Sequence, residues 1–177
     1  MNLEETRTVL RVIQDTYSNF HVTSNTMIQT WQTLLSDVEA KQCQEALISY
    51  IRTDTSGFAP TVGQLIDHMS RLQAINEPSE MEAWSLVTKA LRDSTYHAKD
   101  RFNELPVSVQ KAVGSPDVLK EWGQTDLESV GTVIQSNFLK AYRTVCERQR
   151  EFSKLPQSIQ KLATSTTNRL EANNETS

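Results

Sequence analysis

Apolar residues at helical spacing constrain the fold of this chain most strongly, and they are clearest between residues 26 and 65. One stripe comprises Met27, Ile28, Trp31, Leu34, Leu35 and Val38, and the next comprises Ala40, Cys43, Leu47, Tyr50 and Ile51. Recurrence every three or four residues places each stripe on one face of a helix. An aromatic-proline segment, Phe58-Ala59-Pro60-Thr61, then leads to a further stripe that begins at Val62. We therefore expect helices that pack through these faces.

Cap residues indicate where the helices of this region begin. Asn2 with Glu5 resembles a capping box, and it precedes a stripe of Val9, Leu10, Ile13 and Tyr17. The helix of the Ala40 stripe is expected to have Ser36 or Asp37 as its cap.

The helix after the hinge is expected to begin near Thr61, because Pro60 fixes the backbone just before it. Four stripes with short connections predict an antiparallel helical bundle over residues 1–76. Its expected core includes Trp31, Leu34, Phe58 and Pro60.

The polar run from Asn76 to Ser79 marks an expected domain boundary. Ser79 with Glu82 forms a second capping box. The helix behind it is expected to bury Met81, Trp84, Val87 and Leu91. Residues 93–104 are polar with isolated aromatic side chains at Tyr96 and Phe102.

Two short helices are expected next, each opened by proline and ended by glycine: Leu105-Pro106 to Gly114, and Ser115-Pro116 to Gly123. Thr125 with Glu128 forms a third capping box before a long helix. Its stripe runs through Leu127, Val130, Ile134, Phe138, Ala141, Val145 and Phe152. These elements predict a second helical domain over residues 79–155, with Trp84 and Phe138 in its core.

The C-terminal end is expected to be a flexible tail over residues 156–177. A weak helical segment follows Pro156 as far as Leu162, and the residues beyond it have almost nothing to bury. Glycine and proline are scarce, at five each, and no strand alternation is visible. The predicted fold class is all-α: a small N-terminal helical bundle, a second helical domain and this tail.

One internal repeat stands out, because residues 102–111 recur as residues 152–161. The sequences are FNELPVSVQK and FSKLPQSIQK. One interpretation is that both are the same way of starting a helix after proline. The other is that the second copy, from Leu155 to Leu162, mimics the first and competes for its docking groove.

Side chains for catalysis are missing from the sequence patterns. No glycine lies in a phosphate-binding GxxxxGK[ST] motif, and the histidines His21, His68 and His97 are far apart. Cys43 and Cys146 lie on apolar stripes, which is typical of free buried thiols. We expect no enzyme activity, no metal site and no cofactor.

Charge limits the classes of partner. The net charge of −4 excludes a strongly basic nucleic-acid binder, and no segment has the roughly 18 apolar residues of a membrane span. We expect a cytosolic protein with no membrane contact. Candidate partner-binding residues are Trp122, which lies in a short turn between two glycines, the basic stretch of Lys140, Arg143, Arg148, Arg150, Lys154 and Lys161, and Leu155 within that stretch. The alternatives are a core tryptophan and a solvated helix face.

The order of aromatic residues and prolines resembles a known family. Residues 1–72 carry Tyr17 and Phe20, then Trp31 and Leu34-Leu35, then the hinge from Phe58 to Thr61. This pattern is similar to the N-terminal domain of the helicase loader and inhibitor proteins of bacteriophages that infect low-GC Gram-positive bacteria. The second half is similar to segments of phage replication proteins, through Ala83-Trp84, Phe102, Leu105-Pro106, the run from Ala112 to Pro116, Trp122 and the run from Phe138 to Tyr142.

The resemblance implies a protein without ATPase activity that works in the host bacterial cytoplasm. Its folded N-terminal domain is joined to a flexible C-terminal part, which engages the hexameric replicative helicase. The helicase is held inactive and delivered to an initiator bound at the phage origin, and DNA binding is weak or indirect. Here the second half is patterned to fold, so the helicase-binding region stays open.

Two alternatives from other classes also remain open. One is a replication accessory protein that binds DNA directly through residues 140–161. The other is a helical structural or assembly protein of the virion.

Overall fold

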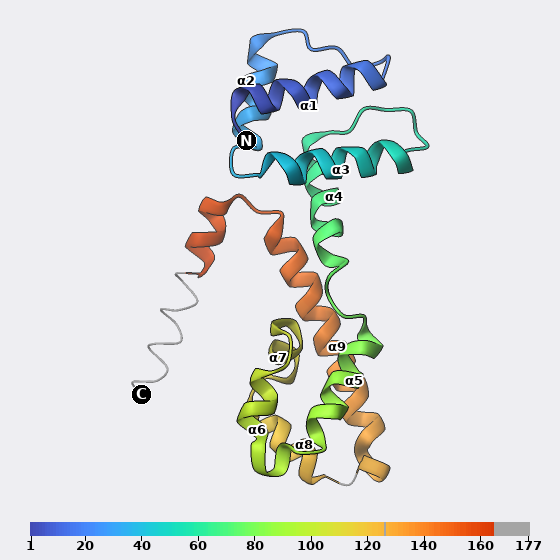
Figure 1. The fold of residues 1–177 in the computed structure, drawn as a ribbon, viewed down its shortest axis with the longest axis vertical. Helices are drawn as coiled ribbons and strands as arrows, with labels where there is room; N and C mark the ends of the chain where they lie inside the picture. Colours follow the sequence, from blue (N-terminus) through green and yellow to red (C-terminus); the bar gives the residue numbers. More distant parts are fainter. Residues whose placement is uncertain (126, 165–177) are drawn as a thin grey trace. The chain divides into compact units, whose positions relative to one another are not determined.

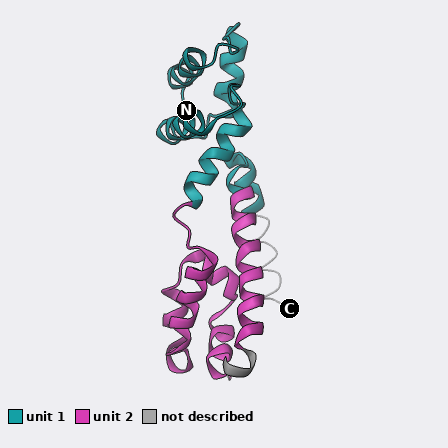
Figure 2. Cartoon of the chain, turned by 90° about the vertical axis from the view of Figure 1, so that its right-hand side faces the viewer, with its two compact units in different colours: residues 1–74, 152–177 teal, residues 75–151 magenta. Residues whose placement is uncertain are grey.

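The computed structural model describes residues 1–125 and 127–164, and every regular element in that part of the chain is a helix (Figure 1). This confirms the predicted all-α fold class. The chain divides into two compact units (Figure 2). The N-terminal unit contains Met1–Ala74 together with the described residues from Phe152 onward, and the second unit contains Ile75–Glu151. The expected boundary at residues 76–79 lies close to the first of these divisions.

Four helices build the first part of the N-terminal unit: α1 (Leu3–Thr16), α2 (Asn25–Leu34), α3 (Ala40–Thr53) and α4 (Val62–Ala74). α1 begins with the expected capping box of Asn2 and Glu5. α4 begins with a reciprocal pair, because the Thr61 hydroxyl accepts the Gln64 N–H at 3.3 Å and the Gln64 side chain accepts the Thr61 N–H at 2.8 Å. Such pairs satisfy amide groups that the first turn leaves without partners.

The start of α3 differs from its prediction. Glu39 is the N-cap residue and its side chain makes no capping bond. Ser36 donates its hydroxyl back to the Thr33 carbonyl instead, and the Asp37 carboxylate accepts the backbone N–H of Gln157. The expectation that Ser36 or Asp37 caps this helix is therefore wrong, because both side chains are engaged elsewhere.

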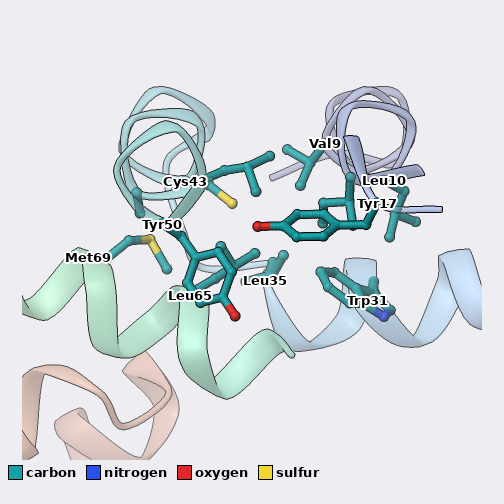
Figure 3. Close-up of a cluster of buried hydrophobic side chains, with 12 residues drawn as sticks. Val9, Leu10, Tyr17, Trp31, Leu35, Cys43, Tyr50, Leu65 and Met69 are labelled. Carbon is teal, nitrogen blue, oxygen red and sulfur yellow. The ribbon is translucent and has the colours of Figure 1, made fainter. Parts of the chain in front are cut away.

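The core of the N-terminal unit receives side chains from all four helices (Figure 3). Its buried members are Val9, Leu10, Ile13, Tyr17, Trp31, Leu35, Cys43, Ala46, Leu47, Tyr50, Leu65 and Met69. Most of them occupy the stripes seen in the sequence. Pro60 is also fully buried at the end of the hinge.

Two residues expected in this core lie on the surface. Leu34 is 52% exposed, because Trp31 and Leu35, four positions apart, define the buried side of α2. Phe58 is 67% exposed: its main-chain carbonyl accepts a hydrogen bond from the Tyr50 hydroxyl at 3.2 Å, while its ring faces solvent. The hinge is thus held through its backbone and Pro60.

The second unit contains α5 (Glu80–Leu91), α6 (Ser94–Asn103), α7 (Val107–Val113), α8 (Pro116–Gln124) and most of α9 (Leu127–Ser153). Phe138 lies at the centre of an aromatic group in its core. The ring centroids of Trp84, Tyr142 and Trp122 lie 5.6, 5.8 and 6.5 Å from that of Phe138. Ser79 and Glu82 form the expected capping box of α5, and Gly114 ends α7 with a φ of 98°.

Two expectations for this unit are corrected, at Met81 and Gly123, and the structure adds a helix that the sequence patterns do not predict. Met81 is 62% exposed, since α5 buries Ala83, Val87 and Leu91 on another side. Residues 93–104 contain α6, whose sequence shows little apolar period because only Ser94 and Phe102 are buried along it. α8 continues past Gly123 to Gln124. The third capping box, with Glu128, lies outside the side chains that the structure describes.

Candidate partner-binding surfaces

The predicted basic stretch is divided between the two units. Lys140, Arg143, Arg148 and Arg150 lie on the part of α9 that belongs to the second unit. Lys154, Leu155 and Lys161 belong to the N-terminal unit. Each group is therefore described by itself.

The α9 group offers less positive charge to a partner than its sequence indicates. Arg143 pairs with Glu80 through two contacts of 2.9 Å, Nε with Oε1 and Nη2 with Oε2. This hydrogen bonding lowers the pKa of the Glu80 carboxyl and raises that of the Arg143 guanidinium. Glu147 follows Arg143 at four-residue spacing, so it lies on the same side of the helix. Such a mixed face is typical of a solvated helix.

Trp122 packs against the second core. Its indole is half-buried and stands edge-on to the Phe138 ring, with 6.5 Å between the ring centroids. This placement agrees with the alternative interpretation of a core tryptophan.

Residues 152–164 lie against the N-terminal unit through polar contacts; we call them the tail segment. The Lys154 ammonium lies 2.9 Å from a carboxylate oxygen of Asp67, and each side chain is about a quarter exposed, at 24% and 26%. The hydroxyls of Ser153 and Ser70 lie 3.2 Å apart. The tail segment thus contacts three residues of the N-terminal unit: Asp67, Ser70 and, as described next, Asp37. The sequence patterns predict none of the three as a binding residue.

Asp37 caps the helix of the tail segment from a distant part of the chain. Residues 157–164 are helical, and the backbone N–H of Gln157 in their first turn donates to Asp37 Oδ2 at 2.7 Å. The Gln157 side chain also donates to the Asp37 carbonyl at 3.3 Å. A carboxylate at this position satisfies a free amide and interacts favourably with the helix dipole.

The tail segment leaves its apolar stripe largely uncovered. Phe152, Leu155, Ile159 and Leu162 are 37%, 41%, 46% and 67% exposed. In the first copy of the repeat, the matching residues Leu105, Val109 and Ala112 are 7%, 0% and 9% exposed. Equivalent residues thus form a core in one place and a surface in the other.

The two copies share one backbone conformation. The Gln110 side chain donates to the Leu105 carbonyl at 2.7 Å, and the Gln160 side chain donates to the Leu155 carbonyl at the same distance. The backbone N–H of each leucine donates to the carbonyl of the preceding phenylalanine, Phe102 or Phe152, at 3.2 and 3.1 Å. The repeat is therefore a local helix-start motif used twice. Whether one copy competes for the groove of the other stays a prediction.

Within residues 1–125 and 127–164, no three metal-ligating side chains gather, and no helix in this part is long and apolar enough to span a membrane. Burial raises the pKa of the Cys43 thiol to about 11. A thiol in that state is a poor nucleophile near neutral pH.

Comparison with known proteins finds a family whose model matches most of the N-terminal helices. A family model for the N-terminal domain of the helicase loader of phage SPP1 matches residues 1–66. The match confirms the resemblance to phage helicase loaders over these residues. No curated protein and no solved structure matches the chain.

Proposed function

We propose that this chain is a non-enzymatic DNA-replication accessory protein that binds the hexameric replicative helicase, because the family model for the N-terminal domain of the SPP1 helicase loader matches residues 1–66. It holds the helicase inactive, delivers it to an initiator bound at a phage origin, or does both. The domain match is the observation that carries this proposal, since it supports a helicase loader-type replication protein. The site of action is the host bacterial cytoplasm.

The tail segment is the best candidate for the helicase-binding surface. Phe152, Leu155, Ile159 and Leu162 recur at three- and four-residue spacing and remain 37–67% exposed. Ile159 and Leu162 lie on the helix of residues 157–164, Leu155 lies in the turn before that helix, and Phe152 lies in the last turn of α9. Exposed apolar side chains on such a segment bind by entering a groove of the partner. Lys161, exposed on the same helix, adds a positive charge for an acidic rim.

The structure gives less support to the DNA-binding alternative. Arg143 is paired with Glu80, and Glu147 and Glu151 lie among the basic residues of α9. Binding to the phosphate backbone depends on cations that release counterions, and paired arginines contribute less to that process.

A pair of matched variants tests the proposed surface. The double substitution Leu155→Asp with Ile159→Asp places two charges on the stripe, and Val133→Asp with Ile48→Asp places two charges on other exposed apolar positions. We expect the first variant to lose inhibition of helicase unwinding and the second to retain it. Equal inhibition by both variants would move the helicase-binding surface away from the tail segment.

A further inference from the structure

The two copies of the repeat differ at few positions, and those positions have a common property. Aligning residues 102–111 with residues 152–161 leaves these pairs unlike: Asn103 and Ser153, Glu104 and Lys154, Val107 and Gln157, Val109 and Ile159. The last pair is conservative. The other three residues of the second copy, Ser153, Lys154 and Gln157, are the ones that contact Ser70, Asp67 and Asp37.

One shared residue serves the motif itself in both copies. Gln110 and Gln160 bond to the carbonyls of Leu105 and Leu155 within their own copies. By contrast, Ser153, Lys154 and Gln157, which differ from the residues of the first copy, make polar contacts with the N-terminal unit.

The cap of the helix supports the same division. In the first copy, Pro106 is the N-cap residue of α7 and no side chain caps that helix. In the second copy, the Asp37 carboxylate accepts the Gln157 N–H, and the Gln157 side chain bonds to the Asp37 carbonyl. Val107, at the matching position of the first copy, has no side-chain donor for such a bond and is 62% exposed.

We propose that Asp37, Asp67 and Ser70 form a specific binding site, the tail seat, for residues 152–160 of this same chain, and that the segment leaves and re-enters it. The charges of the seat are complementary to residues 152–160 of this chain. Two carboxylates face one ammonium, Lys154, and one helix start, Gln157. A segment with the residues of the first copy would bring Glu104 toward Asp67 and be repelled.

The tail segment is expected to leave and re-enter the seat because its apolar side chains are only partly buried there. The apolar residues that anchor the first copy in a core, Leu105 and Val109, have counterparts in Leu155 and Ile159 that stay 41% and 46% exposed. Polar contacts at a partly exposed surface hold a segment weakly, because water competes for each of them. The seat is therefore an on–off contact, and its existence does not depend on the proposed helicase role.

Hydrogen–deuterium exchange on the full chain tests the seat directly. A helix of eight residues has little stability alone in water, so the amides of residues 157–164 are protected only while the segment is seated. The variant Ser153→Asn with Lys154→Glu and Gln157→Val gives the second copy the contact residues of the first. We expect its tail amides to exchange about tenfold faster than those of the unchanged chain.

Two further variants complete the design. Asp37→Ala removes the cap from the opposite side of the contact, and we expect the same acceleration. Lys161→Glu makes the same charge change as Lys154→Glu within the tail segment, at an exposed position away from the seat contacts, and we expect no effect. Unchanged protection in α1 and α3 shows that the bundle remains folded.

Three outcomes would overturn the proposal. Fast exchange of residues 157–164 in the unchanged chain would mean that the segment is not seated. Equal protection in the unchanged chain and in both seat variants would mean that other contacts hold it. Protection that rises with protein concentration would make the occupant the tail segment of a second copy.

Discussion

The ammonium of Lys154 and the carboxylate of Asp67 lie 2.9 Å apart, and this pair joins the end of the described chain to α4. Asp67 also pairs with Arg71 at 2.7 Å. The Asp67 carboxylate therefore pairs with two cations: Arg71, four residues away on the same helix, and Lys154, which is distant in the sequence.

Removing that carboxylate should release the tail segment. In Asp67→Asn the amide keeps a similar size and loses the charge that attracts Lys154. We expect trypsin to cleave after Lys154 several-fold faster than in the unchanged chain, because seating protects the backbone there. Asp15→Asn, at an exposed position of α1, is the control and should leave the cleavage rate unchanged.

A close approach between helices of the second unit predicts a destabilising substitution. A Cβ atom added at Gly123 would lie 2.0 Å from Ser94 Oγ and 3.2 Å from the Leu91 carbonyl. Ser94 is fully buried and donates its hydroxyl to that carbonyl, so it has little room to move. We expect Gly123→Ala to lower the free energy of unfolding by about 1–3 kcal/mol in urea titrations.

Gly63→Ala is the matched control for that substitution. Gly63 lies in the first turn of α4, and a Cβ there would meet its nearest atom at 4.0 Å. Alanine favours a helix over glycine by about 1 kcal/mol, so this variant should be neutral or slightly more stable. Equal losses of unfolding free energy in Gly123→Ala and Gly63→Ala would show that the close approach of Ser94 is not what destabilises the Gly123 variant.

The raised pKa of the buried Cys43 thiol predicts that the free energy of unfolding falls at alkaline pH. Burial raises its pKa from 9.0 to about 11, so the folded chain retains its proton where the unfolded chain loses it. The stabilisation is complete below pH 9 and is lost as the pH rises from 9 to 11. A decline of up to about 2 kcal/mol is expected in that window.

Urea titrations between pH 8 and 11 measure this effect. Cys43→Ala leaves a small cavity and lowers stability at every pH, but it removes the ionisable group. Its decline between pH 9 and 11 should therefore be shallower than that of the unchanged chain. Tyr17, whose pKa burial raises to about 12, still contributes in both proteins above pH 10. Parallel curves would contradict a role for the Cys43 proton.

Truncation tests where the helicase binds. Removing residues 152–177 deletes the tail segment and leaves Phe138 and Tyr142 in the second core. We expect this variant to lose helicase binding while circular dichroism still reports a folded helical protein. Removing residues 140–177 would also take away Tyr142, whose hydroxyl bonds to the Pro78 carbonyl at 2.6 Å, so it is a poorer test. Unchanged binding by the shorter truncation would place the surface in the remaining residues.

The sequence predicts those parts of the fold that local rules govern. The capping boxes at Asn2 and Ser79, the proline before α4 and the stop at Gly114 need only neighbouring residues, and the structure contains all of them. The sequence does not predict α6, because its apolar period is weak; only Ser94 and Phe102 are buried along it. The predicted burial of Leu34 is wrong because a stripe does not say which of two adjacent apolar residues, Leu34 or Leu35, faces inward. The predicted burial of Phe58 is wrong because the hinge is held through the Phe58 carbonyl and Pro60, which leaves the ring exposed.

The sequence does not predict the tail seat, because only the fold brings its residues together. Asp37 and Asp67 are ordinary acidic residues until the fold brings Gln157 and Lys154 to them. One signal is present in the sequence. Apart from the conservative pair of Val109 and Ile159, the two copies differ only at Ser153, Lys154 and Gln157, and this pattern indicates a different partner for each copy.

The most direct test of the central proposal is the mass of the complex formed with a replicative helicase. The purified chain is mixed with the hexameric helicase of a Gram-positive host, with and without ATP, and separated by size-exclusion chromatography with light scattering. We predict a stable complex whose mass equals one hexamer plus a fixed number of copies of this chain. Elution of the helicase and this chain as separate species under both conditions would contradict the helicase-binding role.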